Sequence, residues 1–110
     1  MIDSRKLDDM MDELSFAESM SGTPLIRAAV AMVAAKRDIY MTKELYPALA
    51  KANGITSAAA ERRMRNAISN AVDCCDRIET SFAWQRFIGG QAPTVSEVVT
   101  RLARRCSIEK

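Results

Sequence analysis

Apolar residues recur at intervals of three and four positions along nearly the whole chain, and no stretch alternates apolar and polar residues as a half-buried strand would. Aromatic residues make up only 5% of the sequence, so small and flexible aliphatic side chains must fill the core, which suits helices packed on helices. The 110 residues fit one domain. We therefore predict an all-α fold, a compact bundle of five or six helices that forms a single domain over residues 1–110.

Small polar caps, prolines and glycines divide this pattern into helices. The dipeptide Thr23-Pro24 is typical of a helix start, and the segment TVSE (94–97) has the spacing of a capping box. Pro47 indicates that the third helix either kinks there or begins its regular part there, whereas Gly54 suits a left-handed helix end. The expected helices cover about residues 4–20, 24–37, 43–53, 57–78, 81–88 and 94–106, and the second, apolar almost all round, should be the most buried.

Several classes of function are excluded by residue types. The chain has no histidine, and Cys74, Cys75 and Cys106 form neither a CxxC pair nor an even-numbered disulfide set, so we expect reduced thiols that line the core. The acidic side chains of residues 8–13 would project to different sides of a helix, which argues against a metal site. No nucleophile, acid–base pair or phosphate loop assembles. We predict no enzymatic activity, no catalytic residues, no metal and no cofactor.

Charge is distributed unevenly, although the net charge is only +2. Residues 1–19 hold six acidic and two basic side chains, whereas residues 101–110 hold four basic and one acidic, so one surface is expected to meet a polyanion. The longest apolar run, residues 25–35, is too short to cross a bilayer, and the first twenty residues have no signal-peptide pattern. We expect a cytoplasmic protein with no membrane partner. Phe82, Trp84 and Phe87 are expected to anchor a helix to the core.

The segment from about residue 43 to residue 78 has the steric pattern of a helix-turn-helix. Such a motif needs a small residue in its first helix, a glycine in the turn, an apolar residue after it, and a small residue in the second helix. Ala50, Gly54, Ile55 and Ala60 fill these four positions. Leu49 and Met64 would support the same contact, and Asn53 stands where a larger apolar residue is common.

This alignment predicts which side of the second helix faces outward. If Ala60 points inward, the start of a recognition helix over about residues 57–76 presents an arginine-bearing face, and arginine can bond a guanine edge in the major groove. A solvated amphipathic helix would show the same pattern, so the alternative stays open. Arg63 lies about 100° from Arg62 and should reach a phosphate or solvent. The candidate DNA-binding residues are Thr56, Ser57, Ala58, Glu61, Arg62, Arg63, Arg65 and Asn66.

The stretch MTKELYPALAKANGITSAAAERRMRNAI (41–68) resembles the DNA-binding half of the stage-zero sporulation response regulator family, most specifically in LYP (45–47) and in ER--R (61–65). The segments LIRAAVAMV (25–33) and PTVSEVVTRLA (93–103) resemble the second and last helices of the same domain. The resemblance covers nearly the whole chain. It implies an all-helical bundle around a helix-turn-helix that recognises a short asymmetric DNA box, often as tandem copies.

The resemblance also implies site residues and partners. Glu61, Arg62 and Arg65 correspond to the family's contacts to bases and phosphates, while Asn66 stands in place of a histidine and Ala59 in place of a groove arginine. The family contacts the RNA polymerase sigma subunit through the segment after the recognition helix, which here is shorter and different. The family's receiver domain has no counterpart in this sequence, so we expect DNA binding without phosphorylation, on the nucleoid.

A second function, from a different class, remains open. The bundle could keep the fold and act as a protein-interaction module that binds a regulator or the sigma subunit instead of an operator. The acidic first helix and the replaced groove arginine, at Ala59, favour this alternative.

Overall fold

The computed structural model describes residues 2–73, 78–89 and 93–107. Within these ranges the chain is helical with no strand, apart from one isolated β-bridge between Ile2 and Ser107. The prediction of an all-α bundle of five or six helices is confirmed. The elements are α1 (Ser4–Glu13), α2 (Gly22–Ala35), the π-helical turn η1 (Met41–Leu45), α3 (Tyr46–Asn53), α4 (Ser57–Asp73), α5 (Ile78–Ile88) and α6 (Val95–Cys106).

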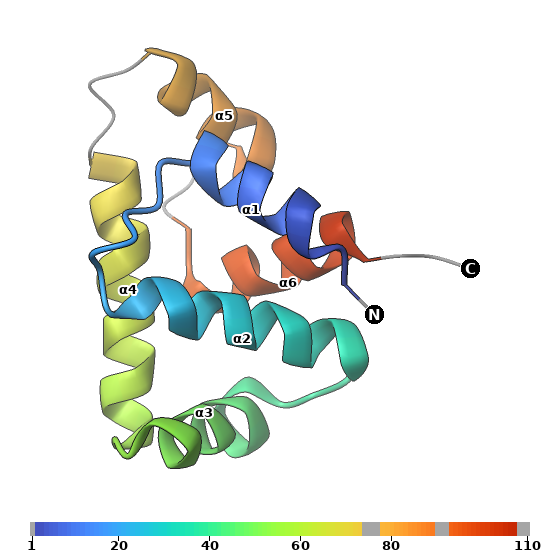
Figure 1. Cartoon of the computed structure of the whole chain (residues 1–110), viewed down its shortest axis with the longest axis vertical. Coiled ribbons are helices and arrows are strands. Elements are labelled where there is room, and N and C mark those ends of the chain that lie inside the picture. The colour runs from blue at the N-terminus through green and yellow to red at the C-terminus, as the bar shows by residue number, and fades with distance from the viewer. Residues whose placement is uncertain (1, 74–77, 90–92, 108–110) are drawn as a thin grey trace.

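Helix α2 is the centre of the bundle, as its all-round apolar sequence predicted. It packs against α3, α4 and α6, and Figure 1 shows it crossing the middle of the molecule with α4 at its amino end and α3 below it. The side chains of Ile26, Ala29 and Val30 are fully buried there. Of the residues that the structure describes, none belongs to a helix long and apolar enough to cross a lipid bilayer.

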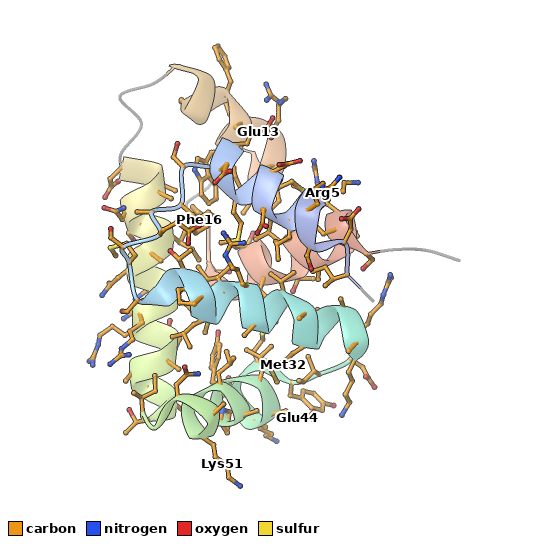
Figure 2. The ribbon with its side chains drawn as sticks, in the orientation of Figure 1. Arg5, Glu13, Phe16, Met32, Glu44 and Lys51 are labelled. Atoms are coloured by element: carbon orange, nitrogen blue, oxygen red, sulfur yellow. The ribbon has the colours of Figure 1, made fainter. Side chains whose placement is uncertain are left out.

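Helix α1 ends at Glu13, so the prediction that it continues to about residue 20 was wrong. Asp3 caps its start by accepting a hydrogen bond from the Lys6 backbone N–H at 3.1 Å. The chain then turns at Ser15, which has a positive φ of 64°. The turn frees the Leu14 carbonyl to accept from the Trp84 indole N–H at 2.9 Å. It also sends Phe16 into the core, where its ring lies 5.8 Å from that of Trp84 (Figure 2).

Helix α2 begins at Gly22, not after a Thr23 cap, so that expectation was wrong too. Thr23 is fully buried within the first turn, and its hydroxyl donates to the Ala17 carbonyl at 2.7 Å. Ser21 stands at the cap position without a side-chain hydrogen bond to the helix. The threonine therefore ties α2 to the preceding loop and does not cap the helix.

The carboxyl-terminal helices follow the predicted pattern with two differences. Helix α5 begins at Ile78, earlier than the expected residue 81, and Phe82 is 55% exposed, so the prediction that it packs in the core was wrong. Trp84 and Phe87 are buried as predicted. The predicted N-cap at the start of α6 is confirmed, because the Glu97 N–H donates to the Thr94 hydroxyl at 3.1 Å, and the Glu97 carboxylate in turn accepts from that hydroxyl at 3.0 Å.

Cys106 is the last residue of α6, and its free thiol is fully buried. Burial raises the pKa of the Cys106 thiol, which keeps it protonated. This confirms that Cys106 lines the core, whereas Cys74 and Cys75 lie outside the described residues. Arg101, Arg104 and Arg105 are exposed on the opposite face of α6, as its stripe predicted.

Candidate nucleic-acid interface

The turn between α3 and α4 has the geometry that its sequence predicts. Gly54 is left-handed, with φ 65° and ψ 33°, and the Ile55 N–H donates to the Ala50 carbonyl at 3.0 Å. Thr56 then caps α4, because its hydroxyl accepts from the Ala59 N–H at 3.1 Å. On the other side, the regular part of α3 begins at Tyr46, directly before Pro47, and η1 precedes it. The second of the two alternatives for Pro47 is therefore correct.

Gly54→Ala is expected to destabilise the fold by about 1–2 kcal/mol, because an alanine pays a steric cost in the left-handed region. A Cβ at this position would meet no other atom within 4 Å, so the backbone conformation alone sets the loss. Gly54→Asn should recover part of it, since asparagine tolerates this conformation. Urea unfolding measures both variants. An alanine variant as stable as the parent, or an asparagine variant worse than alanine, would contradict this reading of the turn.

The contact between α3 and α4 is closed by small and flexible side chains. Leu49, Ala50, Ala60 and Met64 are all buried at this junction, as the steric pattern predicted. Asn53, the residue that departs from that pattern, turns its side-chain amide back to donate to the Leu49 carbonyl at 2.7 Å. Asn53 is thus the last residue of α3, and its polar side chain does not disturb the contact between α3 and α4.

The outward face of α4 carries several arginines, and its side chains are small near the start of the helix. Ala58, Arg62, Arg65 and Asn66 are exposed along this face, and Arg63 is exposed to one side of it. No ion pair involves Arg62 or Arg63 within the described part of the chain. Thr56 is exposed before the helix, whereas Ser57 and Glu61 are half-buried and mark the edge of the face.

Glu61 makes a contact that the sequence reasoning missed. Its carboxylate forms an ion pair with Arg65 at 3.1 Å, and the two side chains are 29% and 58% exposed. Spacing of four residues on a helix, with the acid first, is the signal that could have revealed it. Glu61 also lies near Tyr46 of α3: burial, and then the negative charge of Glu61, raise the pKa of the Tyr46 hydroxyl. The negative charge of Glu61 therefore acts on Tyr46 of α3 as well as on Arg65 of the outward face.

Helix α2 packs against α4. Gly22 approaches the main chain of α4 so closely that a Cβ built on it would lie 1.9 Å from the Arg63 carbonyl oxygen. No side chain can fit between the two helices at this point, so the glycine fixes their spacing. The arginine-bearing face is thus carried on a helix that two neighbours, α2 and α3, support directly.

Lys51 is an exposed cation on α3, the first helix of the helix-turn-helix, and the sequence reasoning passed over it. It lies in the last turn of α3, is exposed, and projects away from the body of the molecule (Figure 2). Within the described residues, no cluster of three or more cysteine, aspartate or glutamate side chains is placed to hold a metal ion. The chemistry offered here is cationic and hydrogen-bond donating, which suits phosphates and base edges.

Comparison with known proteins agrees with this geometry. Residues 7–106 match the family described as sporulation initiation factor Spo0A C terminal. No curated protein matches the chain significantly. The matched range covers nearly the whole chain and all of the helices that the structure describes, except the first turn of α1. The chain therefore belongs to the Spo0A C-terminal family, the DNA-binding effector domains of a sporulation transcription regulator.

Proposed function

We propose that the chain is a sequence-specific transcription regulator that places α4 in the major groove of double-stranded DNA. The observation that carries this proposal is the exposed row of Ala58, Arg62 and Arg65 on a helix that begins directly after a tight turn. The small residue leaves room for close approach, and the two guanidinium groups can reach base edges beyond it. In this proposal residues 1–110 act as one domain in the cytoplasm, on the nucleoid.

Each candidate residue then has a separate role. Arg62 and Arg65 bond guanine edges, and Asn66 can bond an adenine edge through its amide. Arg63, displaced to the side, contacts a phosphate. Thr56 and Ser57, with the free N–H groups of the first turn of α4, receive another phosphate at the positive end of the helix.

Glu61 sets the direction of Arg65 before DNA arrives. The ion pair uses one of the terminal nitrogens of Arg65, Nη1. A guanidinium has five N–H donors, so the others stay available for a guanine. A side chain already held in place loses less conformational entropy on binding. Glu61 itself can accept from a cytosine amino group, which would extend the recognised sequence by one base.

The alternative, a protein-interaction module, makes a different prediction about salt. A DNA-reading domain releases counterions, so the logarithm of its binding constant should fall steeply and linearly with the logarithm of salt concentration. A module that binds a regulator or the sigma subunit would show little affinity for duplex DNA at any salt concentration. Binding of tandem or dimeric copies on DNA would raise the apparent affinity through avidity, and this belongs to the first proposal.

Arg65→Ala and Arg63→Ala are expected to weaken DNA binding in different ways. Arg65→Ala should lose about 1–3 kcal/mol against the preferred site and relax specificity there. Arg63→Ala should weaken all sequences alike and lower the salt slope by up to about one unit. Binding curves on specific and scrambled duplexes at several salt concentrations measure both effects.

The control for Arg65→Ala is the double variant with Glu61→Gln. Removing the arginine alone leaves the Glu61 carboxylate without its partner, which could repel DNA. The double variant removes that charge and is compared with Glu61→Gln alone, so the specificity lost between those two variants belongs to Arg65. If Arg65→Ala and Arg63→Ala gave the same loss on every duplex, the assigned orientation of α4 would be wrong.

A further inference from the structure

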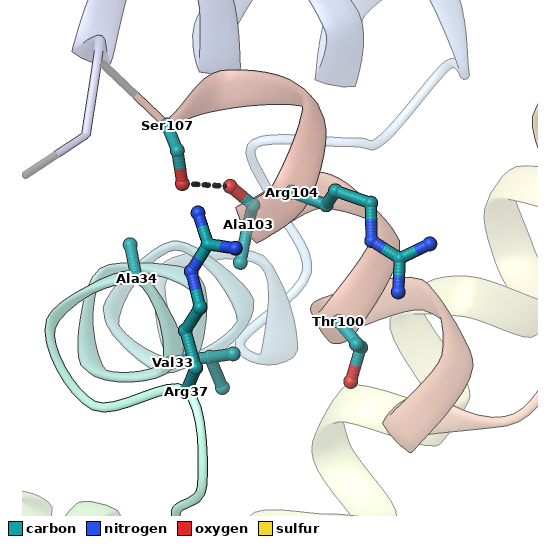
Figure 3. Close-up of a pocket in the computed structure, with 7 residues that line it drawn as sticks. All are labelled: Val33, Ala34, Arg37, Thr100, Ala103, Arg104 and Ser107. Atoms are coloured by element: carbon teal, nitrogen blue, oxygen red, sulfur yellow. Dashed lines mark hydrogen bonds between the residues drawn. The ribbon is translucent and has the colours of Figure 1, made fainter. Parts of the chain in front are cut away.

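A small cavity opens between the carboxyl ends of α2 and α6, away from the outward face of α4. It has a volume of about 120 Å³, and its wall is formed by Val33, Ala34 and Ala103. Two arginines also line it: Arg37, from the turn that follows α2, and Arg104 of α6 (Figure 3). Figure 3 shows Arg37 extending from the end of α2 toward Ser107, whereas the Arg104 guanidinium lies on the side of Thr100. The cavity is therefore open to solvent, and its apolar wall is flanked by two positively charged side chains.

The charges around this cavity favour an anion. Neither Arg37 nor Arg104 forms an ion pair with any residue that the structure describes. The carboxyl ends of α2 and α6 each contribute a partial negative charge of roughly half a unit, which two full guanidinium charges outweigh. The Ser107 hydroxyl is already used, since it donates to the Ala103 carbonyl at 2.5 Å. The remaining donors are therefore the Arg37 guanidinium on the side of Ser107 and, on the other side, the Arg104 guanidinium and the Thr100 hydroxyl (Figure 3).

A second, shallower hollow continues along α6 from the same edge. It has a volume of about 270 Å³ and shares Thr100 and Arg104 with the first cavity. Glu97 and Arg101 also line this second hollow, and the Arg101 guanidinium donates to the Phe87 carbonyl at 3.4 Å. The Glu97 carboxylate would repel an anionic group there, whereas none of the described residues that line the first cavity carries a carboxylate. The anionic head of a ligand therefore fits the first cavity, between the arginines, and a neutral remainder can extend into the second.

We propose that this cavity is a binding site for a small organic phosphate. A phosphate group offers three acceptor oxygens, which match two guanidinium groups and a hydroxyl better than the two oxygens of a carboxylate do. The apolar wall of Val33, Ala34 and Ala103 packs against the carbon skeleton next to the phosphate. Helix α2 meets α4 at its amino end, at Gly22, whereas this site lies at the carboxyl end of α2. A ligand bound here therefore does not cover the proposed DNA-reading face.

Phenyl phosphate is the probe for this site, titrated into the isotope-labelled full chain and followed by backbone amide shifts. The shifts should saturate and concentrate at Ala34, Ala103 and Ser107. Neutral benzyl alcohol should give no saturating shifts, and inorganic phosphate should bind more weakly than phenyl phosphate. Arg37→Gln and Arg104→Gln should each raise the Kd about tenfold, the loss expected for one hydrogen bond to a charged group.

Arg105→Gln is the matched control. Arg105 is exposed on the same helix, but its guanidinium lies over the Phe87 ring, 5.5 Å from the ring centre, and does not line the cavity. Its removal should leave the Kd unchanged. Ala34→Leu, which narrows the cavity and keeps both arginines, should abolish saturation. Shifts that rise linearly without saturating, or an equal loss in Arg105→Gln, would overturn the proposal.

Discussion

Ala58→Glu is expected to lower the affinity for duplex DNA by about 100-fold or more, which corresponds to roughly 3 kcal/mol, the cost of leaving a desolvated charge without a partner. Ala58 is exposed in the first turn of α4, where the proposed complex brings the helix closest to the groove. A carboxylate there would face the phosphates and the acceptor-rich edges of the bases. The fold should not suffer, because a glutamate in the first turn of a helix interacts favourably with its positive end.

Ala58→Gln separates charge from size. Glutamine has the same length without the charge, so it should lose much less affinity than glutamate does. Circular dichroism establishes that both variants keep their helices, and fluorescence anisotropy with a labelled duplex gives the affinities. Parental affinity in Ala58→Glu would show that this face of α4 does not enter the groove.

Gly22→Ala is expected to destabilise the fold by about 3 kcal/mol or more, at the upper end of the range for inserting atoms into a packed interior. The new Cβ would lie 1.9 Å from the Arg63 carbonyl oxygen, a main-chain atom that cannot move without shifting α4. Alanine favours helices over glycine by only about 1 kcal/mol, which cannot offset the clash. For a domain of this size the thermal midpoint should fall by roughly 10–20 °C.

Ser21→Ala is the neighbouring control. Ser21 is exposed and makes no capping hydrogen bond with its side chain, so its replacement should change stability by no more than about 0.5 kcal/mol. Thermal unfolding followed by circular dichroism compares the two variants. If Gly22→Ala unfolded at the parental temperature, the close approach of α2 to α4 would not be present in solution.

The recognition helix was predictable because its determinants are local. Gly54, the Thr56 cap and the inward positions of Ala60 and Met64 all follow from turn chemistry and helical spacing. The same reasoning found the Thr94 cap and its pairing with Glu97, which depend on residues three positions apart. Where residues close in sequence determine the local structure, the sequence was sufficient to predict it.

The errors occurred where distant segments decide the local structure. Helix α1 ends early because the Leu14 carbonyl meets Trp84, seventy residues away, and no local pattern contains that contact. The start of α2 depends on the approach of Gly22 to Arg63. Both of these depend on the packing of whole helices, which periodicity does not determine. Phe82 is the exception: it lies two positions from the buried Trp84, about 200° around α5, so helical spacing already places it on the opposite side.

The candidate site shows both cases. Helical spacing placed Arg62 and Arg65 on the outward side, where the structure has them, and Asn66, which entered through the family resemblance, is exposed as well. The ion pair between Glu61 and Arg65 was missed because both residues were assigned separately to DNA, although their spacing favours pairing with each other. Their roles on DNA remain predictions that binding experiments must decide.

Selection of bound sequences from a random duplex library, with the purified chain, tests the central claim most directly. If α4 reads the major groove, the selected duplexes should share one short motif that contains guanines for Arg62 and Arg65. The same selection with Ala58→Glu should yield no motif. A parental selection without enrichment, together with no salt-dependent binding to any duplex, would contradict the account and favour the protein-interaction module.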